Sequence, residues 1–508
     1  MAQFGQAAAE GTQTGGHRSH GAHCRACDPA APSTLHSMQP AADTPPADLA
    51  PTLARLRGAW RARTPDLVQR RGDLQRLRDA LKRRLPEMAD AIAADFGHRS
   101  RHESLLADGM TVLTELDHLR RHLRRWMRPR RVPTGWRFWP ARAELRHAPL
   151  GVVGVIAPWN YPVNLALIPL ATAIAAGNHV YLKPSEHTPR SADFLRALLA
   201  EVFPADRVAV ATGDAEVGAA FAALPFDHLV FTGSTAVGRK VMAAAAANLT
   251  PLTLELGGKS PAIVCADADV ARVAARLATG KWFNAGQTCI APDYVLVVGD
   301  AARRDALAAA LAAEVAARYV GADAGDDYTR IVNDAQFARL QAHLDDARGR
   351  GLEVRTLAPW HDRARRVFAP TLVLDPGDEA SVMQEELFGP ILPIRRVPTL
   401  QAAIAEVDAR DRPLALYPFS DDRDSVEAIL RGTLAGGVTV NDTLLHFGIN
   451  ALPFGGVGAS GMGAYHGRAG FDAMSKQLPV LWQPRRAASD LLRPPYAKLS
   501  RLIDLLVR

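Results

Sequence analysis

The chain has 508 residues, more than one hydrophobic core accommodates, so at least two domains are expected. Apolar residues make up 48% and charged residues 22%, the balance of an ordinary soluble globular protein, and no apolar run is long enough to span a membrane. Four cysteines exclude a disulfide framework and indicate a reducing, cytoplasmic location. The net charge of +7 comes largely from arginine, but no nucleic-acid-binding motif accompanies it, so no nucleic-acid partner is expected.

Residues 1–46 are predicted to be a disordered tail, because they are rich in Ala, Gly, Pro, Ser and Thr and have no apolar periodicity. The tail contains a group of candidate metal ligands, namely His17, His20, His23, Cys24 and Cys27. A zinc site needs a folded frame and a second ligand pair at finger spacing, and none follows. No metal site is therefore predicted.

From Leu49 to about Met127 the spacing of apolar residues is helical, with Leu53, Leu56 and Trp60 on one face. The stretch Pro129–Pro149, marked by prolines and tryptophans, is typical of a turn and hairpin exposed for pairing with another chain.

Short strands and helices then alternate. The strands are predicted at Val152–Ala157, His179–Leu182, Val208–Ala211 and His228–Phe231, and the helices at Leu165–Ala176, Arg190–Val202 and Ala215–Leu224. Units this short predict a parallel βαβ architecture. A second alternating series follows Gly257-Gly258, which is interpreted as the hinge between domains. A basic amphipathic segment, Lys498–Arg508, ends the chain.

Two side chains are candidates for covalent chemistry. Cys289 follows Gly286 among small and polar neighbours, which suits an accessible nucleophile, although a lone cysteine is more often an inert buried thiol. Glu255 is a single carboxylate in the apolar run Leu252–Leu256, where burial costs several kcal/mol unless the group is used or paired. A thiol and a carboxylate together suggest covalent catalysis followed by base-assisted release.

Other motifs favour a nucleotide ligand. Phe231–Arg239 follows a strand and opens a helix whose N-terminus attracts phosphate, with Gly233 allowing close approach. Lys183 and Glu186 follow another strand, where the carboxylate accepts ribose hydroxyls, or else simply begins a helix. Asn160 offers a neutral donor for a developing oxyanion, or is a turn asparagine. The Gly-x-Gly-x-x-Gly match at Gly456–Gly461 has no preceding strand and is interpreted as a tight loop.

These motifs resemble the aldehyde dehydrogenase superfamily in content and order, from about Leu49 to the C-terminus. The resemblance rests on Pro158-Trp159-Asn160, Lys183-Pro184-Ser185-Glu186, Phe231-Thr232-Gly233-Ser234, Glu255-Leu256-Gly257-Gly258-Lys259, Gly286-Gln287-Thr288-Cys289, Glu385-Glu386-Leu387-Phe388-Gly389-Pro390 and Pro453-Phe454-Gly455-Gly456. Finer features, Asn441–Phe447 and Ser460–Gly467, resemble the class 3 branch, and within it the bacterial coniferyl aldehyde dehydrogenases.

The resemblance implies that Cys289 attacks the aldehyde, that Asn160 and the Cys289 amide hold the oxyanion, and that Glu255 activates water to hydrolyse the thioester. It implies NAD as cofactor, with NADP also admitted, bound by Trp159, Lys183, Glu186, Gly233, Ser234, Val237, Gly238, Glu386 and Phe388. The implied substrate is an aromatic, coniferyl-type aldehyde, with a medium- or long-chain aliphatic aldehyde as the alternative. A CoA-acylating enzyme is the rival within the superfamily, and Glu255 argues against it.

The implied fold class is α/β, with a Rossmann-like NAD-binding domain, an α/β catalytic domain and a small β oligomerisation element. The expected division is an NAD-binding domain at 47–128 and 150–256, a catalytic domain at 257–440, and oligomerisation and C-terminal segments at 129–149 and 441–508. The branch further implies a homodimer. Membrane-anchored mammalian class 3 members carry a long apolar C-terminal tail, and this chain has only a short amphipathic segment.

Overall fold

The computed structural model describes residues 43–320, 325–485, 487, 490, 494–496 and 500–507. Tertiary contacts place all of these in one unit, Pro40–Arg508. The predicted tail lies outside the described residues apart from positions 43–46, and the histidine and cysteine group lies outside them entirely. Within positions 43–46, Thr44 already donates its backbone N–H to the carbonyl of Thr212 at 2.8 Å, and the first helix begins at Pro46.

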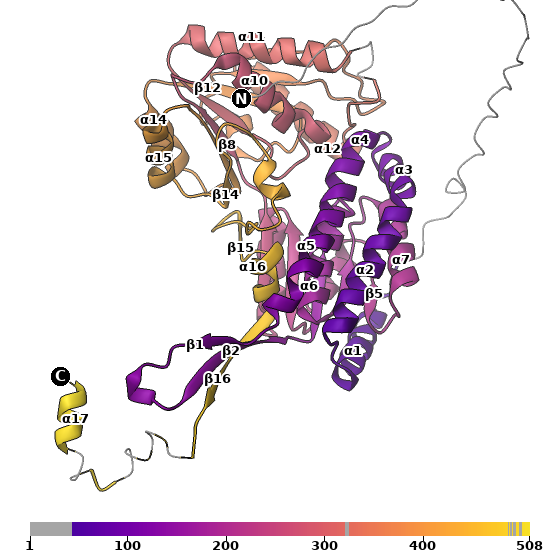
Figure 1. Cartoon of the computed structure of the whole chain (residues 1–508). Helices are drawn as coiled ribbons and strands as arrows, with labels where there is room; N and C mark the ends of the chain where they lie inside the picture. Colours follow the sequence, from indigo (N-terminus) through magenta and orange to yellow (C-terminus); the bar gives the residue numbers. More distant parts are fainter. Residues whose placement is uncertain are drawn as a thin grey trace, which may run out of the picture. The chain divides into compact units, whose positions relative to one another are not determined.

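The N-terminal part of the described chain is helical, as its periodicity predicts (Figure 1). Its helices are α1 (Pro46–Ala62), α2 (Leu67–Arg83), α3 (Leu85–Phe96), α4 (Arg101–Ser104), the π-helical turn η2 (Leu105–Met110) and α5 (Thr111–Trp126). Asp66 caps α2 by accepting the N–H of Gln69 at 2.8 Å, which satisfies one of the free donors of the first turn.

The first sheet has the strand order β15-β7-β6-β3-β4-β5 and is parallel except for β15. Its strands are β3 (Val152–Ile156), β4 (His179–Lys183), β5 (Val208–Val210), β6 (His228–Gly233), β7 (Leu252–Leu256) and β15 (Gly461–Met462). The connecting helices are α6 (Asn164–Ala176), α7 (Pro189–Val202), α8 (Ala215–Ala222) and α9 (Thr235–Ala246). Every residue of α6 is buried, because α6 packs on β3 and β4 as well as on α2 and α5.

The second sheet has the order β10-β11-β12-β9-β8-β13-β14 and is parallel except for β10. Its strands are β8 (Pro261–Val264), β9 (Tyr294–Val298), β10 (Glu353–Thr356), β11 (Thr371–Leu374), β12 (Ile391–Val397), β13 (Ala415–Phe419) and β14 (Gly437–Val438). The helices are α10 (Val270–Trp282), α11 (Ala301–Arg318), α12 (Asp334–Gly349), α13 (Ser381–Gln384), α14 (Leu400–Asp408) and α15 (Arg423–Gly432). Gly257 and Gly258 lie between β7 and β8, where the chain leaves the first sheet for the second.

The third sheet is a small antiparallel one in the order β1-β2-β16, formed by β1 (Arg130–Val132), β2 (Arg142–Pro149) and β16 (Ser475–Trp482) (Figure 1). It pairs the predicted hairpin with a strand from the C-terminal region. Two further helices, α16 (Gly467–Ala473) and α17 (Ser500–Val507), flank β16 in the sequence. Among the described residues no helix is long and apolar enough to cross a membrane.

The α/β fold class predicted from the sequence is confirmed, and most element boundaries agree within one or two residues. One difference bears on the site. The strand predicted to end at Phe231 continues through Gly233, and α9 begins at Thr235 with Ser234 as its capping residue. The extension arises because Thr232 and Gly233 pair with Glu255 and Leu256 of β7.

A buried ion pair ties the helical layer to the first sheet. Arg207, which precedes β5, donates to Asp73 of α2 from Nε and Nη2 at 3.2 and 3.0 Å, and from Nη1 to the carbonyl of Asn178 at 2.8 Å. Both charged side chains are almost fully buried. Such a pair adds little net stability but is costly to break on one side.

Asp73→Asn is expected to lower the free energy of unfolding by about 3 kcal/mol, because Arg207 keeps its charge in the interior without a counter-charge. Denaturant titration and the melting temperature measure the loss. The control is Asp421→Asn, which removes an exposed pair with Arg272 and costs less than about 1 kcal/mol. Equal effects of the two substitutions contradict the prediction.

Candidate active site

A cavity of 810 Å³ lies at the carboxyl ends of the strands of the first sheet. Eight of the predicted site residues line it: Trp159, Asn160, Gly233, Ser234, Glu255, Cys289, Glu386 and Phe388. The other four, Lys183, Glu186, Val237 and Gly238, do not. The cavity therefore joins the N-terminus of α9 to the thiol and carboxylate that the sequence singled out.

The loop that carries Cys289 turns back sharply after α10. Asn284, Ala285 and Gly286 have consecutive positive φ values of 54°, 50° and 74°. Left-handed backbone is unfavourable for the first two residues, so the surrounding contacts must hold it. A Cβ atom on Gly286 would lie 2.4 Å from the carbonyl oxygen of Gly389, which explains why glycine stands there.

The Cys289 thiol is partly exposed to the cavity. Burial, with the negative charges of Glu386 and Glu255, raises its pKa to about 12, while the backbone N–H groups of Cys289 and Ile290 act in the opposite direction. The thiol is therefore protonated at neutral pH in this state. It needs a base or a positive charge beside it to become the reactive thiolate.

Glu255 lies on β7 with its side chain in the interior. Neither carboxylate oxygen has a hydrogen-bond partner among the described residues. Burial raises the pKa of this carboxyl well above its ordinary value. A buried and unsatisfied carboxyl that faces a cavity is costly to the fold and is typical of a functional acid or base.

Asn160 follows β3 and is also buried. Its Nδ2 donates to the carbonyl of Gln287 at 3.1 Å, two residues before the thiol. An amide nitrogen carries two hydrogens, so a second donor is left for the cavity. The sequence interpretation of Asn160 as a side chain beside the reacting carbon is compatible with this position.

The remaining predicted cofactor residues divide into two groups. Lys183 Nζ donates to Glu186 Oε2 and to the carbonyl of Pro184, both at 3.2 Å, just beyond the end of β4. Val237 and Gly238 lie in the first turn of α9, where Ser234 Oγ accepts the N–H of Val237 at 3.4 Å. A Cβ atom on Gly238 would lie 2.5 Å from a methyl carbon of Leu256, so this glycine serves helix-to-strand packing.

Glu386 approaches the backbone of the inter-sheet connection closely. A Cβ atom on Gly257 would lie 1.8 Å from Glu386 Oε2, so a larger residue there would displace the Glu386 carboxyl group. Burial and the nearby Asp293 raise the pKa of Glu386 to about 8, and the N–H of Gly258 lowers it. Phe388 packs edge-on against Trp159, with ring centroids 5.2 Å apart, which closes the same side of the cavity.

Sequence reasoning assigned no role to several residues at the site. Lys259 Nζ holds the Glu386 segment by donating to Asp293 Oδ2 at 2.5 Å and to the carbonyls of Val382 and Glu385. Tyr465 lines the cavity with Glu255 and Cys289, and its hydroxyl has no hydrogen-bond partner among the described residues. Lys259 and Tyr465 both belong to motifs that carry the family resemblance, and this was the only feature of the sequence that pointed to a role for them at the site.

Comparisons with known proteins place this geometry in context. The model of the "Aldehyde dehydrogenase family" matches residues 17–478. A probable coniferyl aldehyde dehydrogenase of Pseudomonas aeruginosa is 47% identical over 88% of this chain and 93% of that protein. Human aldehyde dehydrogenase family 3 member B1 is 41% identical, over 90% and 97% of the two chains.

The solved structures to which this chain is similar also include aldehyde dehydrogenases. The substrate-bound state of Staphylococcus aureus AldH superposes with a TM-score of 0.86 at 36% identity, covering 90% of this chain and 99% of that one. An NAD⁺ complex of a Bacillus cereus aldehyde dehydrogenase has a TM-score of 0.79 at 25% identity, covering 87% and 89%. The family model and the relatives each span most of the chain, and the chain belongs to the aldehyde dehydrogenase family.

Proposed function

We propose that this enzyme oxidises aromatic, coniferyl-type aldehydes to carboxylic acids through a covalent adduct on Cys289, with NAD as the preferred cofactor and NADP accepted. The observation that carries the chemistry is one cavity that holds the Cys289 thiol, the unpartnered Glu255 carboxyl and the Asn160 amide. The similarity to coniferyl aldehyde dehydrogenases supports the aromatic substrate.

The residues support two half-reactions. In the first, Cys289 gives its proton to water in the cavity and its sulfur attacks the aldehyde carbon, and the resulting oxyanion accepts hydrogen bonds from Asn160 Nδ2 and the Cys289 backbone N–H. Loss of hydride from the same carbon leaves a thioester on Cys289. In the second, Glu255 takes a proton from water, the water oxygen attacks the thioester carbon, and the acid leaves as the thiol is restored.

The cavity suits a dinucleotide, which when bound supplies the hydride acceptor. The first turn of α9 opens onto it at Ser234, and a helix N-terminus attracts a pyrophosphate. Lys183 and Glu186 lie beyond the end of β4, two strands along the sheet from β6, and ligands of open α/β sheets bind at the carboxyl ends of strands. Glu386 and Phe388 line the cavity and are proposed to contact the nicotinamide ribose.

Aromatic and apolar side chains line the cavity together with Cys289, and we assign the aldehyde to them. Leu165, Phe454 and Tyr465 line it, and Phe447 packs edge-on behind Phe454 at a centroid distance of 4.8 Å. Flat aromatic rings pack favourably against such a wall.

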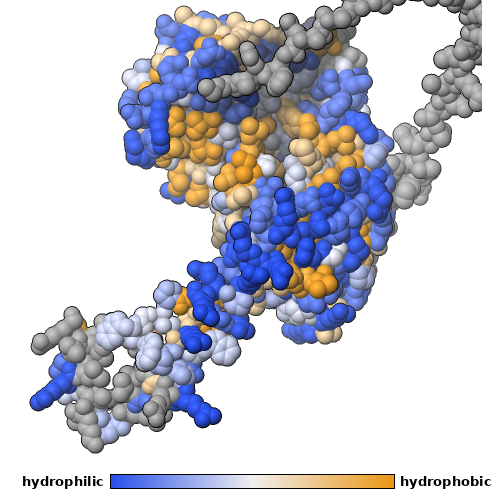
Figure 2. All heavy atoms as spheres, viewed as in Figure 1, coloured by the Kyte–Doolittle hydropathy of each residue, from blue (hydrophilic) through white to orange (hydrophobic). Residues whose placement is uncertain are grey.

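A homodimer is also proposed. Figure 2 shows apolar residues at the surface around β14 and η5 (Leu445–Gly448), beside the hydrophilic surface of α5. The exposed apolar side chains of this region are Leu434, Val440, Leu445, Ile449 and Leu452, and Leu478, Leu481 and Trp482 on β16 are exposed as well. An exposed apolar surface of this kind favours a protein partner.

A reduced catalytic thiol also fits the cytoplasmic location expected from the cysteine content.

The first test is the formation of NADH with a panel of aldehydes. Coniferyl aldehyde and benzaldehyde are expected to give kcat/KM at least about tenfold above hexanal and hexadecanal, because a ring fills the aromatic end of the cavity. Cys289→Ala is expected to fall below about 1% of the wild-type rate while NAD still binds, since only the nucleophile is lost. If hexadecanal gives the highest kcat/KM of the panel, the aromatic assignment is wrong. If Cys289→Ala remains active, the mechanism is wrong.

Glu255→Gln is expected to give a burst of NADH, about one per active site, and then a slow steady rate, because thioester formation proceeds without the base that hydrolysis needs. Because the pKa of Glu255 is raised, the fraction of this group present as carboxylate increases from neutral to alkaline pH. The wild-type steady rate is therefore expected to rise over the same range. The variant is expected to lose that rise. A wild-type steady rate in Glu255→Gln contradicts the assignment.

Cofactor preference is expected to depend on Glu186. The 2′-phosphate of NADP places negative charge against this carboxylate, while Lys183, 3.2 Å away, offsets part of the repulsion. We expect NAD to be favoured by roughly tenfold to thirtyfold in kcat/KM, about 1–2 kcal/mol, and Glu186→Gln to bring the two cofactors close to parity. A ratio that the substitution does not move shows that another residue discriminates.

A further inference from the structure

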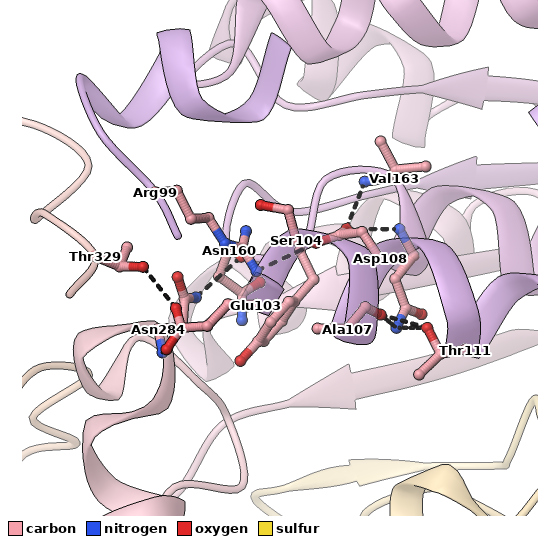
Figure 3. Close-up of polar contacts among 12 residues, drawn as sticks. Arg99, Glu103, Ser104, Ala107, Asp108, Thr111, Asn160, Val163, Asn284 and Thr329 are labelled. Atoms are coloured by element: carbon pink, nitrogen blue, oxygen red, sulfur yellow. Dashed lines mark hydrogen bonds and ion pairs between the residues drawn. The ribbon is translucent and has the colours of Figure 1, made fainter. Parts of the chain in front are cut away.

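A buried polar cluster adjoins the cavity through Asn160, which lines it (Figure 3). It consists of Arg99, Glu103, Asp108, Asn160, Asn284 and Thr329, and we call it the Arg99 cluster. Arg99, Glu103 and Asp108 come from the α3–η2 part of the chain, far in sequence from both Asn160 and Cys289. None of these three lines the cavity.

Arg99 fixes the segment that carries Asn160. Its Nη1 donates to the backbone carbonyl of Asn160 at 2.9 Å, and its Nη2 lies 3.2 Å from Asp108 Oδ2, with both side chains fully buried. Asp108 Oδ1 in turn accepts the N–H groups of Val163 and Asn164 at 3.1 and 3.0 Å. One ion pair therefore holds the middle of the connection between β3 and α6, at Asn160, and the start of α6.

Glu103 fixes the loop that carries Cys289. Its Oε1 accepts the backbone N–H of Asn284 at 3.1 Å, and its Oε2 accepts the Thr329 hydroxyl at 2.6 Å. Asn284 is the first of the left-handed residues before the thiol. Its Nδ2 donates to the carbonyls of Asn160 at 3.1 Å and Gln287 at 3.0 Å, which joins the two segments.

A cluster of buried charges is an unfavourable way to stabilise the fold. Burying a charged arginine and two carboxyl groups costs several kcal/mol per ion unless geometry is favourable, and apolar residues of similar volume serve stability as well or better. Burial raises the pKa of Glu103 to about 7, against the opposing effects of Thr329 and Arg99. What the cluster offers in return is geometry: Arg99 donates to the backbone carbonyl of Asn160, and Glu103 accepts the backbone N–H of Asn284, so each holds one of the two segments beside the cavity.

We propose that Arg99 and Glu103 are positioning residues, Arg99 for the Asn160 amide and Glu103 for the left-handed turn that presents the Cys289 thiol. The inference rests on the proposed function, in which the oxyanion lies between the Asn160 side chain and the Cys289 N–H. A displacement of about 1 Å in such a site costs about 100-fold in rate, even when its cause lies away from the chemistry.

The test compares full-length variants by three measurements: steady-state kinetics with benzaldehyde and NAD, the alkylation rate of Cys289 by iodoacetamide, and the dissociation constant for NAD. Glu103→Ala is expected to lower kcat by about 100-fold and to change the alkylation rate by at least about tenfold, with NAD binding within about twofold of wild type. Glu103→Gln is expected to recover most of both rates, because its amide oxygen still accepts the Asn284 N–H.

Arg99→Lys is expected to lower kcat by more than about tenfold, because one ammonium group cannot reproduce the fork that serves both Asp108 and the Asn160 carbonyl. Asp73→Asn is the matched control, since it disturbs a buried Asp–Arg pair of the same helical layer that touches neither catalytic segment. It is expected to lower the melting temperature and to leave both rates at the wild-type level.

The proposal is overturned if folded Glu103→Ala keeps both kcat and the alkylation rate within threefold of wild type. It is also overturned if Glu103→Gln recovers neither rate relative to Glu103→Ala, or if Asp73→Asn changes the two rates as much as Glu103→Ala does. If Glu103→Ala does not fold, Thr329→Val carries the test. It removes the hydroxyl that orients Glu103 and is expected to lower kcat about fivefold to tenfold at nearly unchanged melting temperature. A wild-type enzyme that forms no NADH refutes the proposed function alone, because the alkylation series still tests the positioning.

Discussion

The structure depends on the crossing of the chain from the first sheet to the second between β7 and β8, at Gly257-Gly258. Glu255 ends a strand of the first sheet, and Cys289 precedes β9 of the second, so the two groups share a cavity only because the chain crosses between sheets there. A side chain at Gly257 would displace the carboxyl group of Glu386, because a Cβ atom there would lie 1.8 Å from Glu386 Oε2. The same backbone that links the sheets thus brings a third acidic group to the site.

Three acidic groups in one cavity set its electrostatics. Glu255, Glu386 and the Cys289 thiol each have a raised pKa, chiefly because burial penalises their charged forms, and the two carboxylates also oppose formation of the thiolate. Charge on one group therefore disfavours charge on the others. In the proposed mechanism Glu255 acts as base once the sulfur is bound in a thioester, when no thiolate charge opposes ionisation of its carboxyl group.

Two buried carboxyl groups, Glu255 and Glu103, differ in their hydrogen bonding. Glu255 has no hydrogen-bond partner among the described residues, which leaves both oxygens for a water molecule. Glu103, in contrast, accepts bonds on both oxygens, from Asn284 and Thr329. A free carboxyl suits a group that exchanges protons, and a saturated one suits a group that holds geometry. This contrast separates the proposed base from the proposed positioning residue.

The sequence by itself determined the α/β class, the strand-helix alternation and the identities of Cys289, Glu255 and Asn160 as candidates, because periodicity and short motifs are local properties. Only the tertiary structure decided that Glu386 packs on Gly257, that Lys183 and Glu186 stand apart from the main cavity, and that Arg99 and Glu103 reach Asn160 and Asn284. Arg99 and Glu103 sit in an ordinary charged helical stretch of the sequence. Their partners lie far along the chain, and no local pattern records which distant backbone group a buried side chain will meet.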